Sequence, residues 1–359
     1  MAIDSSVLHA KLKEFFGFDS FKADQERIIK HLVDKNNAFV LMPTGGGKSL
    51  CYQLPALVME GTAIVISPLI ALMKNQVDAI RGFVAGNDGI AHFLNSSLNK
   101  AQITEVRKDL LSGATKLLYV APESLTKAEN VAMLKEIKIS FYAVDEAHCI
   151  SEWGHDFRPA YRRISDLRAL FPDVPVLALT ATATEEVAAD IQQRLSFRNG
   201  KSFRMSFERK NLVYVVRRTE NKPQELLHIL NRIEGSAIVY ALNRKRTKEV
   251  ADFLLANGIA AEYYHAGLSA ESKDKKEELW KSGKSRVMVA TNAFGMGIDK
   301  PDVRLVVHVD LPNSIESYFQ EAGRAGRDGE KAYAVNNCKN YTCYEHRLLS
   351  TCLRCAETE

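Results

Sequence analysis

Residues 39–49 read Phe39-Val40-Leu41-Met42-Pro43-Thr44-Gly45-Gly46-Gly47-Lys48-Ser49, and this stretch decides the fold of the region around it. Its apolar start predicts a buried strand, and the helical spacing of the apolar residues over 50–58 predicts a helix directly after it. Strand, glycine turn, Lys-Ser pair and helix are the context of a phosphate-binding loop. The alternative is a glycine-rich turn that merely joins a strand to a helix.

The phosphate-binding interpretation has a simple chemical basis. Glycines allow backbone N–H groups to turn toward phosphate oxygens, and a helix N-terminus adds partial positive charge. Lys48 is expected to reach the β- and γ-phosphates, and the Ser49 hydroxyl is expected to bind Mg²⁺. The loop departs from the usual pattern at Met42, where Gly or Ala is common. We predict an ATP and Mg²⁺ site over residues 42–49.

Length and composition limit the class of protein. The chain has 359 residues, enough for two domains, with 46% hydrophobic and 26% charged residues, as in ordinary globular proteins. Its net charge of +4 is too small to indicate a nucleic-acid partner by itself. No apolar run reaches the roughly 18 residues of a spanning helix, and the N-terminus does not read as a signal peptide. We expect a monomer without a membrane partner, located in the cytoplasm with the nucleoid of a bacterium or in a eukaryotic nucleus.

Strands and helices alternate along the first half of the chain. Strands are expected over 63–67, 90–94, 116–120, 141–144 and 176–180, and helices over 12–29 (broken at Gly17), 70–83, 99–112, 127–136, 159–170 and 184–195. Such alternation predicts a parallel sheet covered on both faces. Ligands of such sheets bind at the carboxyl ends of the strands, so polar residues just past those ends are the candidates for function.

The alternation restarts after a seam near residues 197–201. Strands are expected over 212–216, 237–241, 260–265, 286–291 and 304–310, and helices over 223–233, 244–256, 270–282 and from Ser314. This second α/β domain has no phosphate loop, so two similar sheets in tandem suggest an ATP site in a cleft between them. The expected division is a first lobe at 1–205, a second lobe at 206–335, and a short tail at 336–359.

Two adjacent carboxylates, Asp145 and Glu146, follow the apolar strand at 141–144. One is expected to hold Mg²⁺ with its water shell, and the other to orient and deprotonate the attacking water. The alternative is that both residues simply begin a helix, where acidic side chains are favoured.

Several motifs resemble one known family. Asp145-Glu146-Ala147-His148 resembles the DEAH box of superfamily-two helicases, and the loop from Cys149 to Tyr161 resembles the aromatic-rich loop of RecQ DNA helicases. The stretch from Phe21 to Gln25 resembles the adenine-reading motif of that family, with Lys22 in place of the usual Arg. The resemblance covers residues from about 10 to about 330. It implies two tandem RecA-like domains, with Phe21, Lys22 and Gln25 at the nucleotide.

The aromatic-rich loop also has a direct chemical interpretation. Trp153, Phe157 and Tyr161 offer flat faces, and base stacking on aromatic side chains contributes roughly 1–3 kcal/mol per base. The neighbouring arginines supply phosphate partners. The alternative is that Trp153 and Phe157 are ordinary core aromatics. Together with the resemblance, these features assign DNA contacts to Trp153, His155, Phe157, Arg158, Asn243, Arg244 and His265.

The second lobe is expected to supply cations to the nucleotide. Arg324 and Arg327 stand three residues apart in the stretch from Gln320 to Asp328, and a guanidinium on the γ-phosphate contributes roughly 10³–10⁵ in rate in this reaction class. Gln320 and Asp299 are further candidates for nucleotide contacts. The alternative is a charged surface turn with glycine stops.

Cysteines divide into two groups. Cys51 and Cys149 lie in apolar surroundings and are expected to pack as small core residues. Cys338, Cys343, Cys352 and Cys355 fall in the tail, where zinc ligation is one possibility and a poorly ordered segment the other. The tail does not match the zinc and winged-helix modules that usually follow in the family.

The resemblance implies a RecQ-type, ATP-dependent DNA helicase. Such an enzyme would move 3′ to 5′ on single-stranded and partly duplex DNA and act in DNA repair and recombination. Two alternatives stay open. One is an RNA helicase of the same superfamily, and the other is an ATP-gated nucleic-acid-binding module without productive unwinding.

Overall fold

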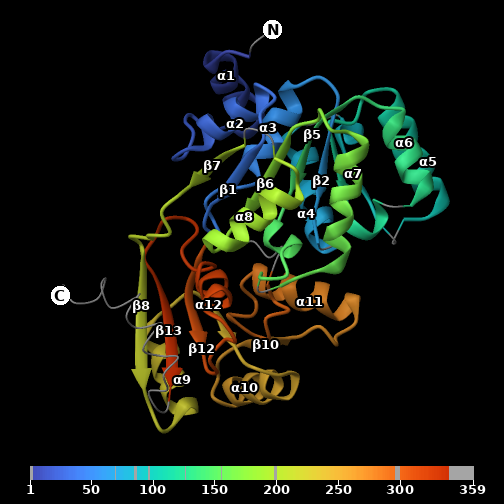
Figure 1. Ribbon diagram of the computed structural model, residues 1–359. Helices are drawn as coiled ribbons and strands as arrows, with labels where there is room; N and C mark the ends of the chain where they lie inside the picture. Colours follow the sequence, from blue (N-terminus) through green and yellow to red (C-terminus); the bar gives the residue numbers. More distant parts are fainter. Residues whose placement is uncertain are drawn as a thin grey trace. The chain divides into compact units, whose positions relative to one another are not determined.

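The alternation of strands and helices that the sequence predicts is present in both halves of the chain. The computed structural model describes residues 3–68, 70–84, 87–95, 98–125, 127–154, 156–197, 200–295 and 300–338. The chain divides into two units, residues 1–207 and residues 208–359. Each unit is built on one parallel sheet (Figure 1).

Unit 1 contains seven strands among its described residues. They are β1 (Ala38–Leu41), β2 (Thr62–Ile66), β3 (Ala91–Leu94), β4 (Leu117–Val120), β5 (Ile139–Val144), β6 (Val176–Thr180) and β7 (Lys201–Arg204). The α-helices are α1 (Ser5–Phe16), α2 (Gln25–Val33), α3 (Leu50–Val58), α4 (Ile70–Phe83), α5 (Lys100–Leu111), α6 (Ala128–Lys135), α7 (Ile164–Leu170) and α8 (Glu185–Arg194). Short 3₁₀ turns are η1 (Asp88–Ile90), η2 (Pro122–Ser124), η3 (Ala147–Ile150) and η4 (Pro159–Arg163).

The strand order of this sheet is β3-β4-β2-β5-β6-β1-β7. Alternate residues of each strand face opposite sides, as Phe39 and Val40 of β1 show, because Val40 packs with α1–α4 and Phe39 with α5–α8. Both faces are therefore buried under helices, which explains the nearly continuous apolar strands.

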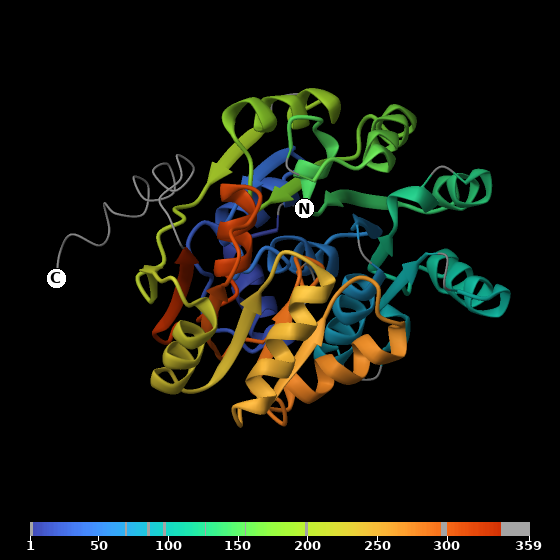
Figure 2. The same ribbon diagram turned by 90° about the horizontal axis from the view of Figure 1, so that it is seen from below.

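Unit 2 has six strands among its described residues. They are β8 (Leu212–Arg218), β9 (Ser236–Tyr240), β10 (Ala261–Tyr264), β11 (Val287–Ala290), β12 (Val303–His308) and β13 (Ala332–Cys338), in the order β10-β11-β9-β12-β13-β8. The helices are α9 (Lys222–Arg232), α10 (Arg244–Ala256), α11 (Ala270–Lys281) and α12 (Ile315–Ala322). Apolar residues of α9 and α10 pack on one face of the sheet, and those of α11 and α12 pack on the other (Figure 2).

Two strands differ from the sequence-based expectation. β7 was not predicted; it pairs only with β1 at the sheet edge, and Phe203 is its one buried residue. β13 was not predicted either, and its residues 336–338 were expected in the tail; the strand lies between β12 and β8. Asn336 and Asn337 have low strand propensity, yet both are buried because the strand is flanked on both sides.

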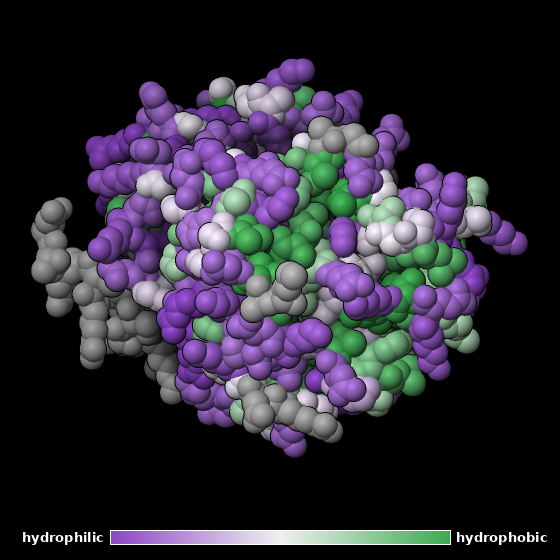
Figure 3. All heavy atoms as spheres, turned by 90° about the horizontal axis from the view of Figure 1, so that it is seen from above, coloured by the Kyte–Doolittle hydropathy of each residue, from purple (hydrophilic) through white to green (hydrophobic). Residues whose placement is uncertain are grey.

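Hydrophilic side chains cover much of the face that Figure 3 draws. Among the described residues, none of the helices has both the length and the apolar character required to cross a bilayer. The face drawn in Figure 3 shows a central group of apolar side chains surrounded by hydrophilic ones. Exposed apolar residues of unit 1 include Phe18 and Phe83, whose rings lie 6.5 Å and 5.2 Å from that of Phe16.

Candidate functional site

The loop at residues 42–49 joins β1 to α3, and its glycines are required by its shape. Gly45 and Gly47 both have a φ of 81°, in the left-handed region that favours glycine. A Cβ on Gly46 would lie 2.6 Å from Cγ of Met42, and one on Gly47 would collide with the side-chain amide of Gln25. The loop is therefore a tight backbone cradle of the kind that binds phosphate.

Met42, which departs from the usual motif, is accommodated by the core. Its side chain is fully buried, its N–H donates to the carbonyl of Thr180 at 3.0 Å, and its own carbonyl accepts from Nζ of Lys48 at 3.2 Å. The Lys48 ammonium thus lies over the loop, where a phosphate group would meet it.

Gln25 is not part of a solvated helix face, because only 2% of it is exposed. Its amide nitrogen donates to the carbonyl of Gly47 at 3.1 Å, and its oxygen accepts from the backbone N–H of Lys22 at 2.8 Å. Phe21 is half-buried, with its ring in edge contact with His9. The structure thus brings the Phe21–Gln25 stretch and the phosphate loop together.

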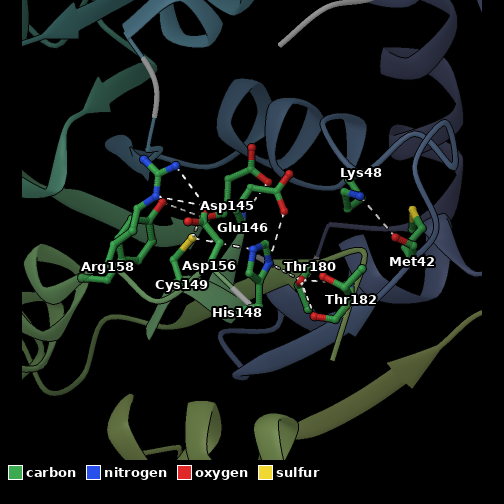
Figure 4. A network of polar contacts seen from close by, with 11 residues as sticks. Met42, Lys48, Asp145, Glu146, His148, Cys149, Asp156, Arg158, Thr180 and Thr182 are labelled. Carbon is green, nitrogen blue, oxygen red and sulfur yellow. Dashed lines mark hydrogen bonds and ion pairs between the residues drawn. The ribbon is translucent and has the colours of Figure 1, made fainter. Parts of the chain in front are cut away.

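Three neighbouring strands bring the acidic residues to the same sheet edge as the loop. Leu41 at the end of β1 pairs with Thr180 at the end of β6, and Val144 at the end of β5 pairs with Ala178. The strands are parallel, so Thr180, Asp145 and the loop that carries Lys48 all lie at the carboxyl ends of adjacent strands (Figure 4).

Asp145 and Glu146 do not behave as helix caps. Glu146 has a φ of 48°, is buried, and makes no side-chain capping bond to η3. Burial of the carboxyl group and, secondarily, the charge of Glu146 raise the pKa of Asp145 to about 7, against the opposing effect of Lys48. Two close carboxylates in a buried site repel each other when both are ionised. A divalent cation bound between them removes this repulsion, so the pair suits such an ion.

His148 connects these acids to the next strand. Its Nδ1 lies 2.9 Å from Oγ1 of Thr180 and 3.4 Å from Oε2 of Glu146. Thr180 in turn bonds the backbone of Thr182 through its hydroxyl, which accepts from the N–H and donates to the carbonyl, both at 3.1 Å. Sequence reasoning did not identify this chain of contacts, because nothing in the spacing shows that Thr180 and His148 meet.

The aromatic-rich loop divides into exposed and buried members. Trp153 is 78% exposed, so it is not a core aromatic. Phe157 is half-buried, with the Arg162 guanidinium 5.1 Å from its ring centre. Tyr161 was expected to offer a flat face, but it is 1% exposed and its hydroxyl donates to the carbonyl of Asp145 at 3.0 Å. That expectation for Tyr161 is wrong, because the ring fills the core beneath the loop.

Arg158 is tied to two segments of unit 1. It donates to Oδ2 of Asp156 from Nε at 3.2 Å and from Nη2 at 2.9 Å, and to the carbonyl of Pro68 from Nη1 at 3.2 Å. His155 lies outside the described residues.

In unit 2, Arg324 and Arg327 follow the end of α12. Arg324 is buried and Arg327 is half-buried. Arg209 braces the turn between them, since its Nη2 donates to the carbonyls of Ala325 at 3.0 Å and Gly326 at 2.7 Å. This contribution of Arg209 was missed by sequence reasoning. The turn between the two arginines is therefore fixed by hydrogen bonds from Arg209, and it is not a freely exposed charged loop.

A buried pair supports the same helix. Nε2 of His308, at the end of β12, lies 2.9 Å from Oε2 of Glu321 on α12, and the His308 ring stacks on Tyr240. Gln320, the neighbour of Glu321, is half-buried. Asp299 lies outside the described residues.

The DNA-side candidates of unit 2 lie past the ends of β9 and β10. The side-chain oxygen of Asn243 caps α10 by accepting from the N–H of Arg246 at 2.9 Å. Partial burial and, secondarily, the charge of Arg244 lower the pKa of His265. A Cβ on Gly267 would lie 2.7 Å from Nη1 of Arg244, so Arg244 stands beside the segment that follows His265, although about twenty residues separate the two in sequence.

The matching family models and the individual relatives indicate the same family for the chain. A DEAD/DEAH box helicase model matches residues 22–191, and a helicase conserved C-terminal domain model matches residues 221–329. An ATP-dependent DNA helicase RecQ from Haemophilus influenzae is 45% identical over 336 residues, which are 93% of this chain and 53% of that protein. The chain belongs to the RecQ family of helicase cores. The RecQ of Bacillus subtilis is 45% identical over 89% of this chain and 54% of its own length.

This RecQ core spans about half the length of the curated relatives it matches. Its fold is also that of solved helicases of low sequence identity. S. cerevisiae Dbp5 bound to RNA and ADP BeF3 has a TM-score of 0.72 at 18% identity, covering 96% of this chain and 90% of that one. The DUF1998 helicase MrfA bound to DNA has a TM-score of 0.78 at 19% identity, covering 98% of this chain and 51% of that one. These likenesses support two RecA-like domains.

The cysteines of the RecQ core are only partly described. Cys51 and Cys149 are buried, as the sequence predicts. The side chain of Cys338 and the whole of Cys343, Cys352 and Cys355 lie outside the described residues, so both alternatives for the tail, zinc ligation and a poorly ordered segment, stay open.

Proposed function

We propose that this RecQ core is a DNA-dependent ATPase that moves 3′ to 5′ along single-stranded DNA and separates duplexes, in DNA repair and recombination. The observation that carries the proposal is the arrangement of Lys48, Asp145 and Thr180 at the ends of three adjacent strands. An exposed tryptophan, Trp153, stands on the loop that follows the acidic pair. The RecQ relatives named above support DNA as the substrate.

Each residue is assigned a part in nucleotide binding. The amides of residues 45–47 cradle the phosphates, Lys48 neutralises them, and Gln25 reads the adenine edge. Phe21, Lys22 and Gln320 are assigned to further nucleotide contacts. Ser49 and Asp145 would hold Mg²⁺, which when bound neutralises charge on the β- and γ-phosphate oxygens. The close pair of carboxylates at Asp145 and Glu146 fits that ion, because Mg²⁺ takes oxygen ligands.

Hydrolysis itself is assigned to residues of both units. Glu146 orients and deprotonates the attacking water, while Arg324 and Arg327 stabilise charge on the γ-phosphoryl group. The network from Glu146 through His148 to Thr180 gives hydrolysis a physical route to neighbouring segments. Trp153, Phe157, Arg158, Arg244 and His265 are assigned to DNA, by stacking and by phosphate contacts.

A second candidate is an RNA helicase of the same superfamily. A putative ATP-dependent RNA helicase of Acanthamoeba polyphaga mimivirus is 43% identical over 90% of this chain and 58% of its own length. The exposed Trp153 favours DNA through the resemblance of its loop to that of RecQ helicases. A third candidate is a nucleotide-gated binder without turnover.

One experiment separates the three candidates. The steady-state ATPase rate is measured with single-stranded DNA, with RNA of the same sequence, and with neither. Strong stimulation by DNA alone is the expected result. Equal stimulation by RNA would favour the RNA helicase, and ATP binding without any stimulation would favour the binder. Lys48→Ala serves as the negative control, with the exposed Lys30→Ala as its match.

A further inference from the structure

Three potential metal ligands converge where the DEAH box meets the aromatic-rich loop. Ligand atoms of His148, Cys149 and Asp156 all lie within 4.8 Å of one another. Sγ of Cys149 lies 3.7 Å from Nε2 of His148 and 3.9 Å from Oδ2 of Asp156 (Figure 4). The nucleotide and DNA assignments made above use neither Cys149 nor Asp156 directly, and they use only Nδ1 of His148, which leaves its Nε2 to this cluster.

The distances suit coordination by one small cation. With metal–sulfur and metal–nitrogen bonds of about 2.3 Å and about 2.0–2.1 Å, tetrahedral ligands stand roughly 3.5 Å apart. The observed separations of 3.7 Å and 3.9 Å are only slightly longer. Cys149 can direct its S–H toward either acceptor, so the thiol proton occupies the space that a cation would take.

The outer contacts also suit a metal-binding histidine. Such a histidine usually donates its second ring N–H to a carboxylate, a backbone carbonyl or a water, which fixes the ring and directs the other nitrogen at the metal. Nδ1 of His148 lies 3.4 Å from the carboxylate of Glu146 and 2.9 Å from the hydroxyl of Thr180. Access is provided on the side of Asp156, whose side chain is 39% exposed.

We propose that His148, Cys149 and Asp156 form a three-ligand site for a thiophilic divalent cation of the Zn²⁺ and Co²⁺ class, with water as fourth ligand. Thiolate and imidazole select such ions over Mg²⁺, which prefers oxygen. Binding exchanges the Cys149 thiol proton for the metal and releases that proton to solvent. The site is distinct from the cysteine-containing tail.

Occupation of the site would restrain the aromatic-rich loop. Asp156 is the partner of Arg158, at 2.9 Å, and a metal competes for the same carboxylate oxygen. The ion would tie Asp156 to the DEAH box and weaken the Asp156–Arg158 pair. We therefore expect Zn²⁺ to suppress DNA-stimulated ATP hydrolysis. This consequence rests on the proposed function, whereas the site itself does not.

Cobalt absorption tests the site directly. The parent protein for this test is the full chain with the substitutions Cys338→Ser, Cys343→Ser, Cys352→Ser and Cys355→Ser. Cys51 and Cys149 are then its only thiols. Titration with Co²⁺, without nucleotide, should give a sulfur-to-cobalt charge-transfer band that saturates at one equivalent. Cys149→Ala should abolish the band, and the matched buried-cysteine variant Cys51→Ala should retain it. Absence of the band in the parent, or its survival in Cys149→Ala, would overturn the proposal.

A second variant keeps the test decisive if Cys149→Ala fails to fold. Asp156→Asn retains the thiol and should bind Co²⁺ at least about tenfold more weakly. Unchanged affinity would remove Asp156 from the site and refute the three-ligand arrangement. Zn²⁺ inhibition of DNA-stimulated ATPase, measured in parallel, should be weaker in Asp156→Asn. If DNA fails to stimulate the ATPase at all, the proposed function fails while the cobalt titration still reports on the metal site.

Discussion

The hydroxyl of Tyr161 donates a 3.0 Å hydrogen bond to the main-chain carbonyl of Asp145. This bond joins the end of the aromatic-rich loop to the backbone of the first acid of the DEAH box. Tyr161 is buried, whereas Trp153 on the same loop is 78% exposed. One aromatic therefore anchors the loop to the acidic residues, and the other is available to a ligand.

Tyr161→Phe keeps the ring and removes this bond. We expect the free energy of unfolding to fall by about 0.5–1.5 kcal/mol, because a buried hydrogen bond contributes that much. Stimulation of the ATPase by DNA should fall as well, since the loop loses its tie to Asp145. Urea denaturation and ATPase assays measure the two effects.

Tyr142→Phe is the matched control for this change. The hydroxyl of Tyr142 is buried and has no hydrogen-bond partner among the described residues. Its removal should leave stability unchanged or slightly higher. Equal destabilisation by both substitutions would show that the Tyr161 bond contributes nothing specific.

Trp153→Ala should abolish DNA stimulation without affecting the fold. The side chain is largely exposed, so Tm should shift by less than about 1 °C, as for most surface substitutions. Loss of one stacking platform removes roughly 1–3 kcal/mol of binding to single strands. Fluorescence anisotropy with labelled DNA measures it, with the exposed aromatic variant Phe18→Ala as control. Wild-type affinity in Trp153→Ala would exclude this loop from the DNA site.

Gln25→Ala should reduce the preference for ATP over GTP. Gln25 contacts the carbonyl of Gly47 at 3.1 Å, so the substitution also loosens the phosphate loop. Sites that hydrogen-bond a substrate group discriminate strongly against analogues lacking it. The KM values for ATP and GTP should therefore approach each other. Gln193→Ala, at an exposed position of α8, is the control. An unchanged ratio of KM values would assign Gln25 to loop support alone.

Arg324→Lys and Arg327→Lys should lower kcat far more than they weaken ATP binding. A guanidinium at the γ-phosphate contributes roughly 10³–10⁵ in rate, and lysine cannot reproduce its fork of donors. Nucleotide binding, measured with a fluorescent ATP analogue, should change only slightly. Arg232→Lys on the exposed face of α9 is the control. A wild-type kcat in both variants would remove these arginines from the reaction.

The sequence predicts most of this fold because its signals are local. Apolar strands and helical periodicity locate the elements around residues 39–58 and 212–256 to within two residues, and the largest difference is at the end of β8. The prediction from sequence fails at β13, because Asn336 and Asn337 are typical loop residues but pair with strands distant in the chain. Local propensity cannot show that pairing.

In the candidate site, too, local motifs could be predicted from the sequence, and contacts between distant residues could not. Glycine and Lys-Ser spacing identifies the phosphate loop, because the turn needs those residue types. The burial of Gln25 against Gly47, the contact of His148 with Thr180, and the anchoring of Tyr161 depend on tertiary neighbours. Functional motifs therefore report which residues matter, while their mutual contacts come only from the fold.

Asp145 should make the protein less stable as pH rises toward neutrality in the absence of Mg²⁺. The pKa of its carboxyl is raised to about 7 from 3.8 by burial and by Glu146. Between about pH 4 and about pH 7 the folded state therefore holds a proton that the unfolded state has lost. Stability falls with rising pH wherever the folded state binds more protons, so the loss is complete above about pH 7.

Asp145→Asn removes this ionisation and should be more stable than the wild type at about pH 8, with a smaller gap at about pH 5. The same variant should lose ATP hydrolysis, because an amide is a poor ligand for Mg²⁺. In the wild type, the Mg²⁺ concentration for half-maximal ATPase should rise as pH falls from about 8 to about 6, since the ion must displace the proton. Asp173→Asn, at an exposed position, is the control for both measurements. A Tm difference between Asp145→Asn and wild type that does not vary with pH would show that Asp145 is already ionised across this range.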